Sequence, residues 1–294
     1  MCKVKIFFWI GTLTVAMLSC KGRTVGTHVE ETGQQSADGL YSSAVVADRQ
    51  QSEVSRHDQR QPAKVVRMYE IPAPLTDRPE RILYRKGYTT SYNQKTKTPN
   101  WVAWHLTDAH TRGRFQRKEE VFTEDEDIAQ GSRATDNDYY NSRYDRGHMC
   151  PAGDNKWDKL AMTQSFLFTN ICPQHHGLNK YEWNDLEMLC REWAKKYGAI
   201  DIVCGPLFAT DGEQKTIGKN KVWVPEAFFK VVLCRQGTPK AIGFVYRNAG
   251  KKQPMKDAVR SVDEIERLTK MDFFPAVDDR TEVRIEAEAR LSDW

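Results

Sequence analysis

Short runs of β-branched and aromatic residues recur along the chain from Val65 to residue 246. Each run is bounded by polar or turn-forming residues and has the composition typical of a strand. The runs are Val65–Ile71, Ile82–Tyr84, Trp101–Leu106, Ile200–Cys204, Val222–Val224, Phe228–Cys234 and Ala241–Tyr246. Because strands dominate the order and helices only interrupt it, the sequence predicts an α+β fold with a central, largely antiparallel sheet flanked by helices.

Two segments have the periodicity of amphipathic helices. From Lys180 to Tyr197, apolar residues recur every three or four positions, and Gly198 is a typical helix end. The segment from Ser261 to Met271 opens with Ser261 and Glu264, which have the spacing of a capping box. We expect both helices to pack one apolar stripe against the sheet.

The first nineteen residues have the features of a secretory signal peptide. Two lysines precede an apolar run from Ile6 to Leu18, which is shorter than the ~20 residues that a membrane-spanning helix needs. The run ends in Met17-Leu18-Ser19-Cys20, which resembles a bacterial lipobox, although a plain signal peptide followed by a coincidental cysteine would read the same way. We expect lipidation of Cys20, and hence an exported lipoprotein anchored to a membrane through its N-terminal lipid, in the periplasm or at the cell surface.

Residues 20–64 differ in composition from the rest of the chain. They are rich in Gln, Ser, Asp, Glu and Arg, and Tyr41 is their one aromatic residue, so they are expected to form a flexible linker. The folded domain is then predicted over residues 65–294. A mean hydropathy of -0.67 excludes a polytopic membrane protein. The net charge of +4 is too small to indicate a nucleic-acid-binding protein by itself, so such a function has to be argued from a site.

Five cysteines lie in the predicted domain: Cys150, Cys172, Cys190, Cys204 and Cys234. Export would permit disulfides, but an odd number leaves at least one thiol free, and the sequence does not identify pairs. Several could equally be small buried hydrophobic residues. Cys150, Cys172, His175 and His176 lack the paired spacing of structural zinc motifs, so we do not expect zinc.

The segment Asp145-Arg146-Gly147-His148 concentrates chemically active side chains in four positions. Histidine moves protons near neutral pH, and the arginine fork matches phosphate oxygens. Asp145 could hold the imidazole or pair with Arg146. A tight turn with a local Asp145–Arg146 ion pair and a histidine that only packs is the alternative, and for four isolated residues it is the better supported one.

A second group of polar residues surrounds the start of the first predicted helix. Asn179 and Glu182 have the spacing of an N-cap pair, but the side-chain oxygen of Asn179 could instead face a hard divalent cation. Glu187 and Arg191 follow, on the side of the helix away from its apolar stripe. They could form only a surface i,i+4 pair, or Glu187 could accept hydrogen bonds from metal-bound water.

Taken together, this block resembles the DNA/RNA non-specific endonuclease family, the sugar-non-specific nucleases of the ββα-metal superfamily. The matching residues are Asp145-Arg146-Gly147-His148, Thr169-Asn170-Ile171-Cys172-Pro173-Gln174, Leu178-Asn179, Trp183, Leu186-Glu187 and Arg191. Upstream Asn100–Leu106 and downstream Gly205–Phe208 resemble further strands of the family. The resemblance covers roughly Val65 to the C-terminus and implies a ββα-metal fold.

The resemblance also implies a role for each matching residue. His148 would be the general base, Arg146 would stabilise phosphate charge, and Asn179 would be the sole direct protein ligand of Mg²⁺, with Mn²⁺ as an alternative metal. Asn170 would orient the catalytic elements, Glu187 would hold the water shell of the metal, and Arg191 would contact Glu187 or the phosphate. The family leads us to expect one more upstream arginine, for which Arg117 is the best candidate, followed by Arg114. Cys150 departs from the family pattern, so the redox state next to the site is open.

The implied activity is metal-dependent, sequence-non-specific endonucleolytic hydrolysis of phosphodiester bonds in DNA and RNA. Phosphate contacts carry no sequence information, which fits a substrate range of both nucleic acids. Two alternatives are a metal-dependent phosphodiesterase acting on a non-polynucleotide substrate and a non-catalytic nucleic-acid-binding lipoprotein. The sequence leaves open whether the chain forms a homodimer.

Overall fold

The computed structural model describes residues 67–294. The predicted signal peptide, the lipidation site Cys20 and the predicted linker lie outside the described residues, and they remain predictions. Within the described part, no helix combines the length and apolar character needed to cross a bilayer.

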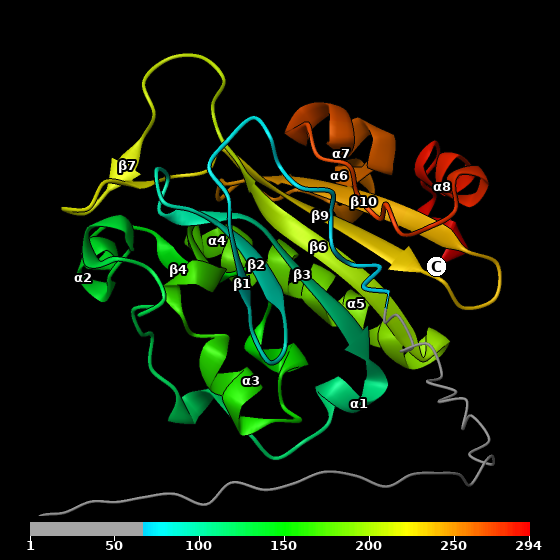
Figure 1. Cartoon of the computed structure of the whole chain (residues 1–294), viewed down its shortest axis with the longest axis horizontal. Helices are drawn as coiled ribbons and strands as arrows, with labels where there is room; N and C mark the ends of the chain where they lie inside the picture. Colours follow the sequence, from blue (N-terminus) through cyan, green and yellow to red (C-terminus); the bar gives the residue numbers. More distant parts are fainter. Residues whose placement is uncertain (1–66) are drawn as a thin grey trace, which may run out of the picture. The chain divides into compact units, whose positions relative to one another are not determined.

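A seven-stranded sheet forms the centre of the described domain (Figure 1). The strand order is β1-β2-β3-β6-β9-β10-β11, and every neighbouring pair is antiparallel. The strands are β1 (Arg81–Tyr84), β2 (Thr89–Asn93), β3 (Thr98–Thr107), β6 (Ala199–Leu207), β9 (Ala227–Cys234), β10 (Lys240–Arg247) and β11 (Val259–Arg260). The expectation of an α+β fold with a central antiparallel sheet is therefore confirmed.

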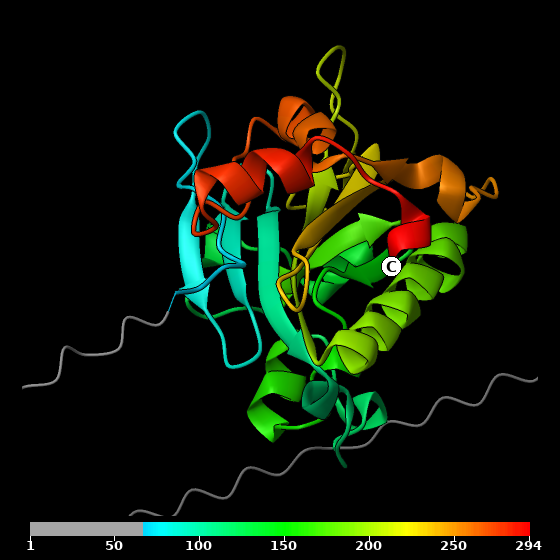
Figure 2. The same cartoon turned by 90° about the vertical axis from the view of Figure 1, so that its right-hand side faces the viewer.

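Both faces of the sheet are buried. Successive side chains of a strand point to opposite faces, and β9 shows this alternation: Phe228 and Val232 belong to one core, Phe229 and Val231 to the other. The first core packs under the long helix α5 (Glu182–Tyr197), and the second packs under α7 (Val262–Thr269) and α8 (Asp279–Glu286). Figure 2 shows the sheet between α5 on one side and the red and orange C-terminal helices on the other.

The two predicted helices are present, with local signals that match their ends. The apolar stripe of α5 is buried through Trp183, Leu186, Cys190 and Trp193, and Gly198 follows the helix with a φ of 86°. α7 begins with the expected capping box: the Ser261 hydroxyl accepts from the Glu264 backbone N–H, and the Glu264 carboxylate accepts from that of Ser261.

Several shorter elements complete the domain. The other α-helices are α1 (Asp108–Thr111), α2 (Asp136–Tyr139), α3 (Lys159–Gln164), α4 (His176–Lys180) and α6 (Met255–Ala258). The 3₁₀ helices are η1 (Arg117–Glu119), η2 (Gln130–Ser132), η3 (Ala152–Asp154), η4 (Phe168–Asn170) and η5 (Leu291–Asp293). Two small antiparallel pairs lie outside the main sheet: β4 (Asp145–His148) with β5 (Ile171–Gln174), and β7 (Thr216–Ile217) with β8 (Val222–Trp223).

The pair β4–β5 followed by α4 and α5 gives the expected ββα arrangement. β5 ends at Gln174, and α4 begins two residues later, so the second strand leads almost directly into the helices. His148 at the end of β4 pairs with Ile171 at the start of β5. The motif segments are thereby held next to one another by backbone pairing.

Two expectations from the sequence are wrong in detail. The described part of the predicted strand Val65–Ile71 is not a strand, although Tyr69 and Ile71 do pack against the second core. The helix predicted from Lys180 is broken at Tyr181, whose φ of -113° and ψ of -90° separate α4 from α5. Asn179 therefore lies inside α4 and does not cap α5, because Tyr181 occupies the cap position.

Candidate active site

A cavity of about 580 Å³ opens between β4, α4, α5 and the segment around η1 and η3. Six of the seven predicted site residues line this cavity: Arg117, Arg146, His148, Asn179, Glu187 and Arg191. They are separated by up to 74 positions in the chain, from 117 to 191. The described fold thus brings a histidine, an amide, a carboxylate and three guanidinium groups to one wall of solvent-accessible space.

His148 is a buried residue in the wall of the cavity. Its ring contacts those of Phe122 and Phe166, with centroid distances of 5.3 and 4.9 Å, and its Nε2 is buried without a hydrogen-bond partner in the described residues. Burial, together with the positive charge of Arg117, lowers the pKa of His148 to about 3. The imidazole is therefore neutral at physiological pH.

Asn170 lies behind His148 rather than in the cavity. Its Oδ1 accepts from the backbone N–H of Cys150 at 2.9 Å, and its Nδ2 donates to the carbonyl oxygens of Cys150 and Ser165, both at 2.8 Å. Its own carbonyl accepts from the backbone N–H of Met149. Asn170 is fully buried and joins η4 to the two residues after His148, so it holds the end of β4 in place.

Asn179 is oriented by Asp145, a residue that sequence reasoning assigned no definite role. The Nδ2 of Asn179 lies 2.9 Å from Oδ2 of Asp145, and the same oxygen lies 2.9 Å from Nδ1 of His176. Because a carboxylate only accepts, the Asn179 atom beside it must be the amino group, which leaves Oδ1 as the free end of the amide. Asp145 does not pair with Arg146, so the alternative of a local ion pair in this motif is wrong.

Arg146 and Arg117 supply positive charge from two different segments. The Nε of Arg146 donates to Oδ1 of Asp136 at 2.6 Å, and its guanidinium lies over the rings of Phe122 and Tyr139. Arg117 lies in η1, upstream of the Asp145–His148 segment in the chain, and also lines the cavity. Arg114 does not line the cavity, so the structure favours Arg117 of the two candidates.

Glu187 and Arg191 lie one turn apart on α5, but no hydrogen bond or ion pair joins them among the described residues, so the alternative of an i,i+4 pair is wrong. Among the described residues the partner of Arg191 is Asp154, with Nη1 at 2.9 Å from Oδ1. Trp104 also donates to Asp154, from Nε1 at 3.1 Å. Arg191 is thus anchored from behind. Burial raises the pKa of Glu187 to about 7, against the opposing charges of Lys230 and Arg191.

Lys230 is a buried cation behind the site that sequence reasoning missed. It is completely buried, its Nζ has no hydrogen-bond partner among residues 67–294, and it lies over the Trp183 and Trp104 rings at 4.4 and 5.5 Å. Its positive charge acts on both Glu187 and Asp154. The alternation of side chains along β9 could have predicted its burial, because Lys230 shares a face with the apolar residues Phe228 and Val232.

The cysteines form no disulfide in the described domain. All five are buried and free. Cys150, next to the motif, is fully buried, its Sγ accepts from Nδ2 of Asn155 at 3.3 Å, and burial raises its pKa further above the usual thiol value. An unionised, inaccessible thiol is a small apolar residue here and not a redox group. Cys150, Cys172, His175 and His176 do not gather as a metal site in the part of the chain described.

The donor set at the cavity wall suits a hard divalent cation. The Oδ1 of Asn179 is a neutral oxygen ligand whose direction is fixed by Asp145, and Glu187 adds a carboxylate on the next helix. Mg²⁺ and similar ions prefer oxygen ligands and keep several waters, so Asn179 and Glu187 are the residues at this wall that could hold such an ion. Among the described residues, no cysteine lines this cavity.

Comparisons with known proteins agree with the geometry. The family model described as DNA/RNA non-specific endonuclease matches residues 68–280. The chain is 38% identical over 205 residues to Nuclease EXOG, mitochondrial, of Danio rerio, which is 65% of this chain and 60% of that protein. It is 33% identical over 205 residues to Endonuclease G, mitochondrial, of Homo sapiens, covering 66% of this chain and 69% of that protein.

A fungal relative and a solved structure extend the comparison. Nuclease C1 of Cunninghamella echinulata is 34% identical over 210 residues, covering 67% of this chain and 83% of that protein. A crystal structure of an EndoG/EndoGI complex superimposes with a TM-score of 0.67 at 27% identity, covering 72% of this chain and 91% of the other. This likeness confirms the expected ββα-metal fold. The chain spans 60% of the length of the Danio rerio relative.

Proposed function

Because this chain belongs to the DNA/RNA non-specific endonuclease family, we propose that it is a metal-dependent nuclease that hydrolyses phosphodiester bonds in DNA and RNA without sequence specificity. One observation carries the proposal: His148, Asn179, Glu187 and the arginines converge on a single open cavity. The relatives whose names state a nuclease activity support the same conclusion.

The geometry supports a role for each protein group in the reaction. The neutral imidazole of His148 accepts the proton of the attacking water, and an anionic phosphate nearby raises the proton affinity of the ring at that moment. Arg146 and Arg117 neutralise charge on the phosphate, and Arg191, fixed by Asp154, adds a third guanidinium. Asn170 acts as a positioning residue through the backbone after His148.

We propose Mg²⁺ as the metal, with Mn²⁺ able to replace it, and Asn179 as its direct protein ligand. Bound there, the ion supplies Lewis acidity to the phosphate and to the leaving oxygen. Asp145 keeps the oxygen of Asn179 directed away from the Asp145 carboxylate, and Glu187, which lines the same cavity, would accept hydrogen bonds from water beside the metal.

The first test is digestion of plasmid DNA and total RNA by the full chain with Mg²⁺. His148→Ala and Asn179→Ala should each lower the rate by about 10²–10⁴-fold while the protein stays folded. Asn137→Ala, at an exposed position away from the cavity, is the matched control and should cut normally.

Other outcomes of the same assay separate the alternatives. Absence of cleavage with any divalent ion, despite binding of nucleic acid, would contradict the proposal and favour the non-catalytic lipoprotein. Cleavage of small phosphodiesters but not of DNA or RNA would favour a phosphodiesterase with another substrate.

We also propose export and lipid anchoring, which rest on the sequence of residues 1–20. A nuclease tethered outside the cytoplasm would act on nucleic acid from the surroundings. The test is fractionation of cells that express the wild-type chain and Cys20→Ala. The wild-type protein should follow the membrane fraction and the variant should not, whereas mature wild-type protein in the cytosol would contradict the proposal.

A further inference from the structure

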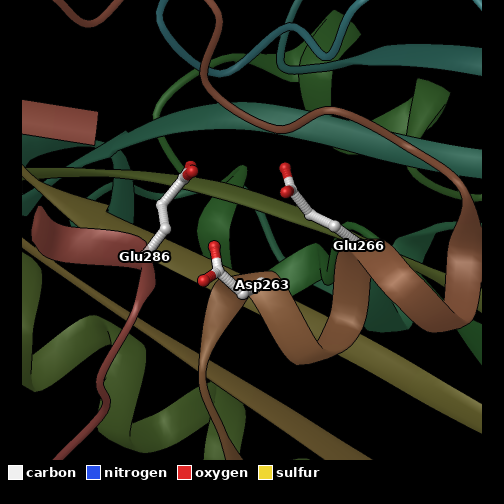
Figure 3. A group of neighbouring side chains, drawn as sticks. All are labelled: Asp263, Glu266 and Glu286. Atoms are coloured by element: carbon white, nitrogen blue, oxygen red, sulfur yellow. The ribbon is translucent and has the colours of Figure 1, made fainter. Parts of the chain in front are cut away.

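Three acidic side chains converge between the two C-terminal helices, on the side of the sheet away from the candidate active site. Asp263 and Glu266 belong to α7, and Glu286 is the last residue of α8. One carboxylate oxygen of each lies within 4.8 Å of the others, and Figure 3 shows the three carboxylates projecting from the two helices toward a common space. α7 and α8 cover the second core, whereas α5 covers the first.

Glu286 distinguishes this cluster from ordinary surface acidity. It is 5% exposed, and its Oε1 is fully buried without a hydrogen-bond partner among the described residues. A buried carboxylate oxygen with no donor is costly, because it has lost its water and gained nothing in return. Since Glu286 points toward Asp263 and Glu266, its neighbours in this space are themselves acceptors.

No basic side chain neutralises the cluster. Between residues 67 and 294, no lysine, arginine or histidine forms an ion pair with Asp263, Glu266 or Glu286. The one hydrogen bond to the three carboxylates within this range comes from the Phe273 backbone N–H, which donates to Oε1 of Glu266 at 2.8 Å. Most carboxylate oxygens of the cluster therefore have no hydrogen-bond donor in the described domain, and no basic side chain there balances their negative charge.

We propose that Asp263, Glu266 and Glu286 form a structural Ca²⁺ site that joins α7 to α8. Calcium takes six to eight oxygen ligands at about 2.3–2.6 Å in flexible geometry, so three carboxylates whose oxygens lie within 4.8 Å of one another can supply part of its shell. Mg²⁺ demands near-octahedral order at about 2.0–2.1 Å, keeps several waters and is usually bound by one or two carboxylates, so a cluster of three suits Ca²⁺ better. Water completes the shell on the side where Asp263 and Glu266 are partly exposed.

Protons are the competing occupants of the cluster. Burial and the neighbouring carboxylates raise the pKa of Glu286 to about 9, and burial is also the main cause that raises the pKa of Glu266 to about 7. A proton on each would relieve the same repulsion without any metal. The two explanations differ in whether Ca²⁺ binds at neutral pH and whether binding depends on Glu286.

The test is calorimetric titration of chelator-treated full-length protein with Ca²⁺, carried out in an Asn179→Ala background so that the candidate active site does not contribute. We expect one Ca²⁺ to bind, and to bind at least about tenfold more weakly when Glu286→Gln or Asp263→Asn is added. Glu288→Gln, an exposed position two residues on, is the matched control and should bind normally. Nuclease activity of Glu286→Gln on its own should equal that of wild type.

Thermal melting gives a second readout that does not depend on any activity. Ca²⁺ at a hundred times its dissociation constant should raise the Tm of the Asn179→Ala protein by about 5–10 °C and leave Asn179→Ala/Glu286→Gln unchanged. Because glutamine has the shape of glutamate and no charge to bury, the variant is expected to fold. Equal Ca²⁺ binding with and without Glu286→Gln, or no binding in the Asn179→Ala protein, would overturn the proposal and leave a cluster that holds protons. A failure of nuclease activity would not affect this result.

Discussion

The positive charge of Lys230 offsets part of the cost of burying two nearby carboxylates, Glu187 in the cavity wall and Asp154 behind it. The Nζ of Lys230 lies over the ring of Trp183, which is one helical turn before Glu187 on α5. Burial raises the pKa of Glu187, and the charge of Lys230 opposes that rise. Lys230→Met should therefore raise the pKa of Glu187 from about 7 by on the order of one unit. The acidic limb of the pH–rate profile should move upward by the same amount, with activity recovered at higher pH.

The control variant makes the same Lys→Met substitution at a position away from the cavity. Lys240 also lies over aromatic rings, those of Tyr197 and Trp294, but at the far end of the sheet. Lys240→Met should leave the pH–rate profile unchanged. An equal shift in both variants would contradict a local effect of Lys230 on Glu187. A uniform loss of rate at every pH in Lys230→Met would show that Lys230 acts only through packing.

Asn170 illustrates how a residue outside the cavity controls one inside it. Asn170→Ala would leave the backbone N–H and carbonyl of Cys150 without their buried partners, which costs about 2–4 kcal/mol of unfolding free energy. Because these groups follow His148 by two residues, the rate should fall as well, by about tenfold or more. Chemical denaturation and digestion assays on the same preparation check both effects, and Asn137→Ala should show neither. A stability loss with unchanged rate would make Asn170 purely structural.

Among the elements, β4 leaves no room for a side chain at Gly147. A Cβ there would lie 2.3 Å from Oε1 of Gln174 and 2.5 Å from its Cβ, on the paired strand β5. Gly147→Ala should therefore force β4 and β5 apart, with a loss of about 1–3 kcal/mol in stability and displacement of His148. Gly131→Ala, where nothing lies within 4 Å, should be neutral in both melting and activity. A fully active Gly147→Ala protein would show that the pairing of β4 with β5 does not position the histidine.

Apolar elements were predictable from the sequence, and polar ones were not. The strands with continuous β-branched and aromatic runs, such as β6 and β9, match the predictions, because burial on both faces imposes that composition. β2, β4 and β5 were missed, since sequences such as Thr89–Asn93 and Asp145–His148 carry polar groups that here bond within the fold. The local sequence indicates a helix cap at Asn179, because nothing in it marks the break at Tyr181.

At the scale of the molecule, the candidate site residues came from the resemblance, and their arrangement came from the fold. Arg117 and Arg191 belong to segments that only the packing of η1, η3 and α5 around β4 brings to one cavity. Asp154 and Asp145, which orient Arg191 and Asn179, lie in or beside segments with no periodicity that marks them. Local patterns carry no information about such long-range partners, so these supporting residues could not be assigned beforehand.

The balance of buried titratable groups predicts how the whole domain responds to pH without divalent cations. Glu187, Glu266 and Glu286 have folded-state pKa values raised to about 7, 7 and 9, so between their unfolded value near 4.5 and these values the folded state binds more protons, and stability falls as pH rises. His148, lowered to about 3, acts oppositely, since below its unfolded value near 6.5 the unfolded state binds the extra proton. Three groups outweigh one, so the free energy of unfolding in chelator should decrease from pH 5 to pH 8.

Urea denaturation at each pH measures this change in the free energy of unfolding. Glu286→Gln should flatten the decrease because it removes the carboxyl with the largest shift, whereas Glu288→Gln should not. Ca²⁺ should restore stability at pH 8 in wild type and in Glu288→Gln, but not in Glu286→Gln. A wild-type stability that rises steadily from pH 5 to pH 8 in chelator would mean that these carboxylates are ionised in the folded protein and paired in a way that the described contacts do not contain.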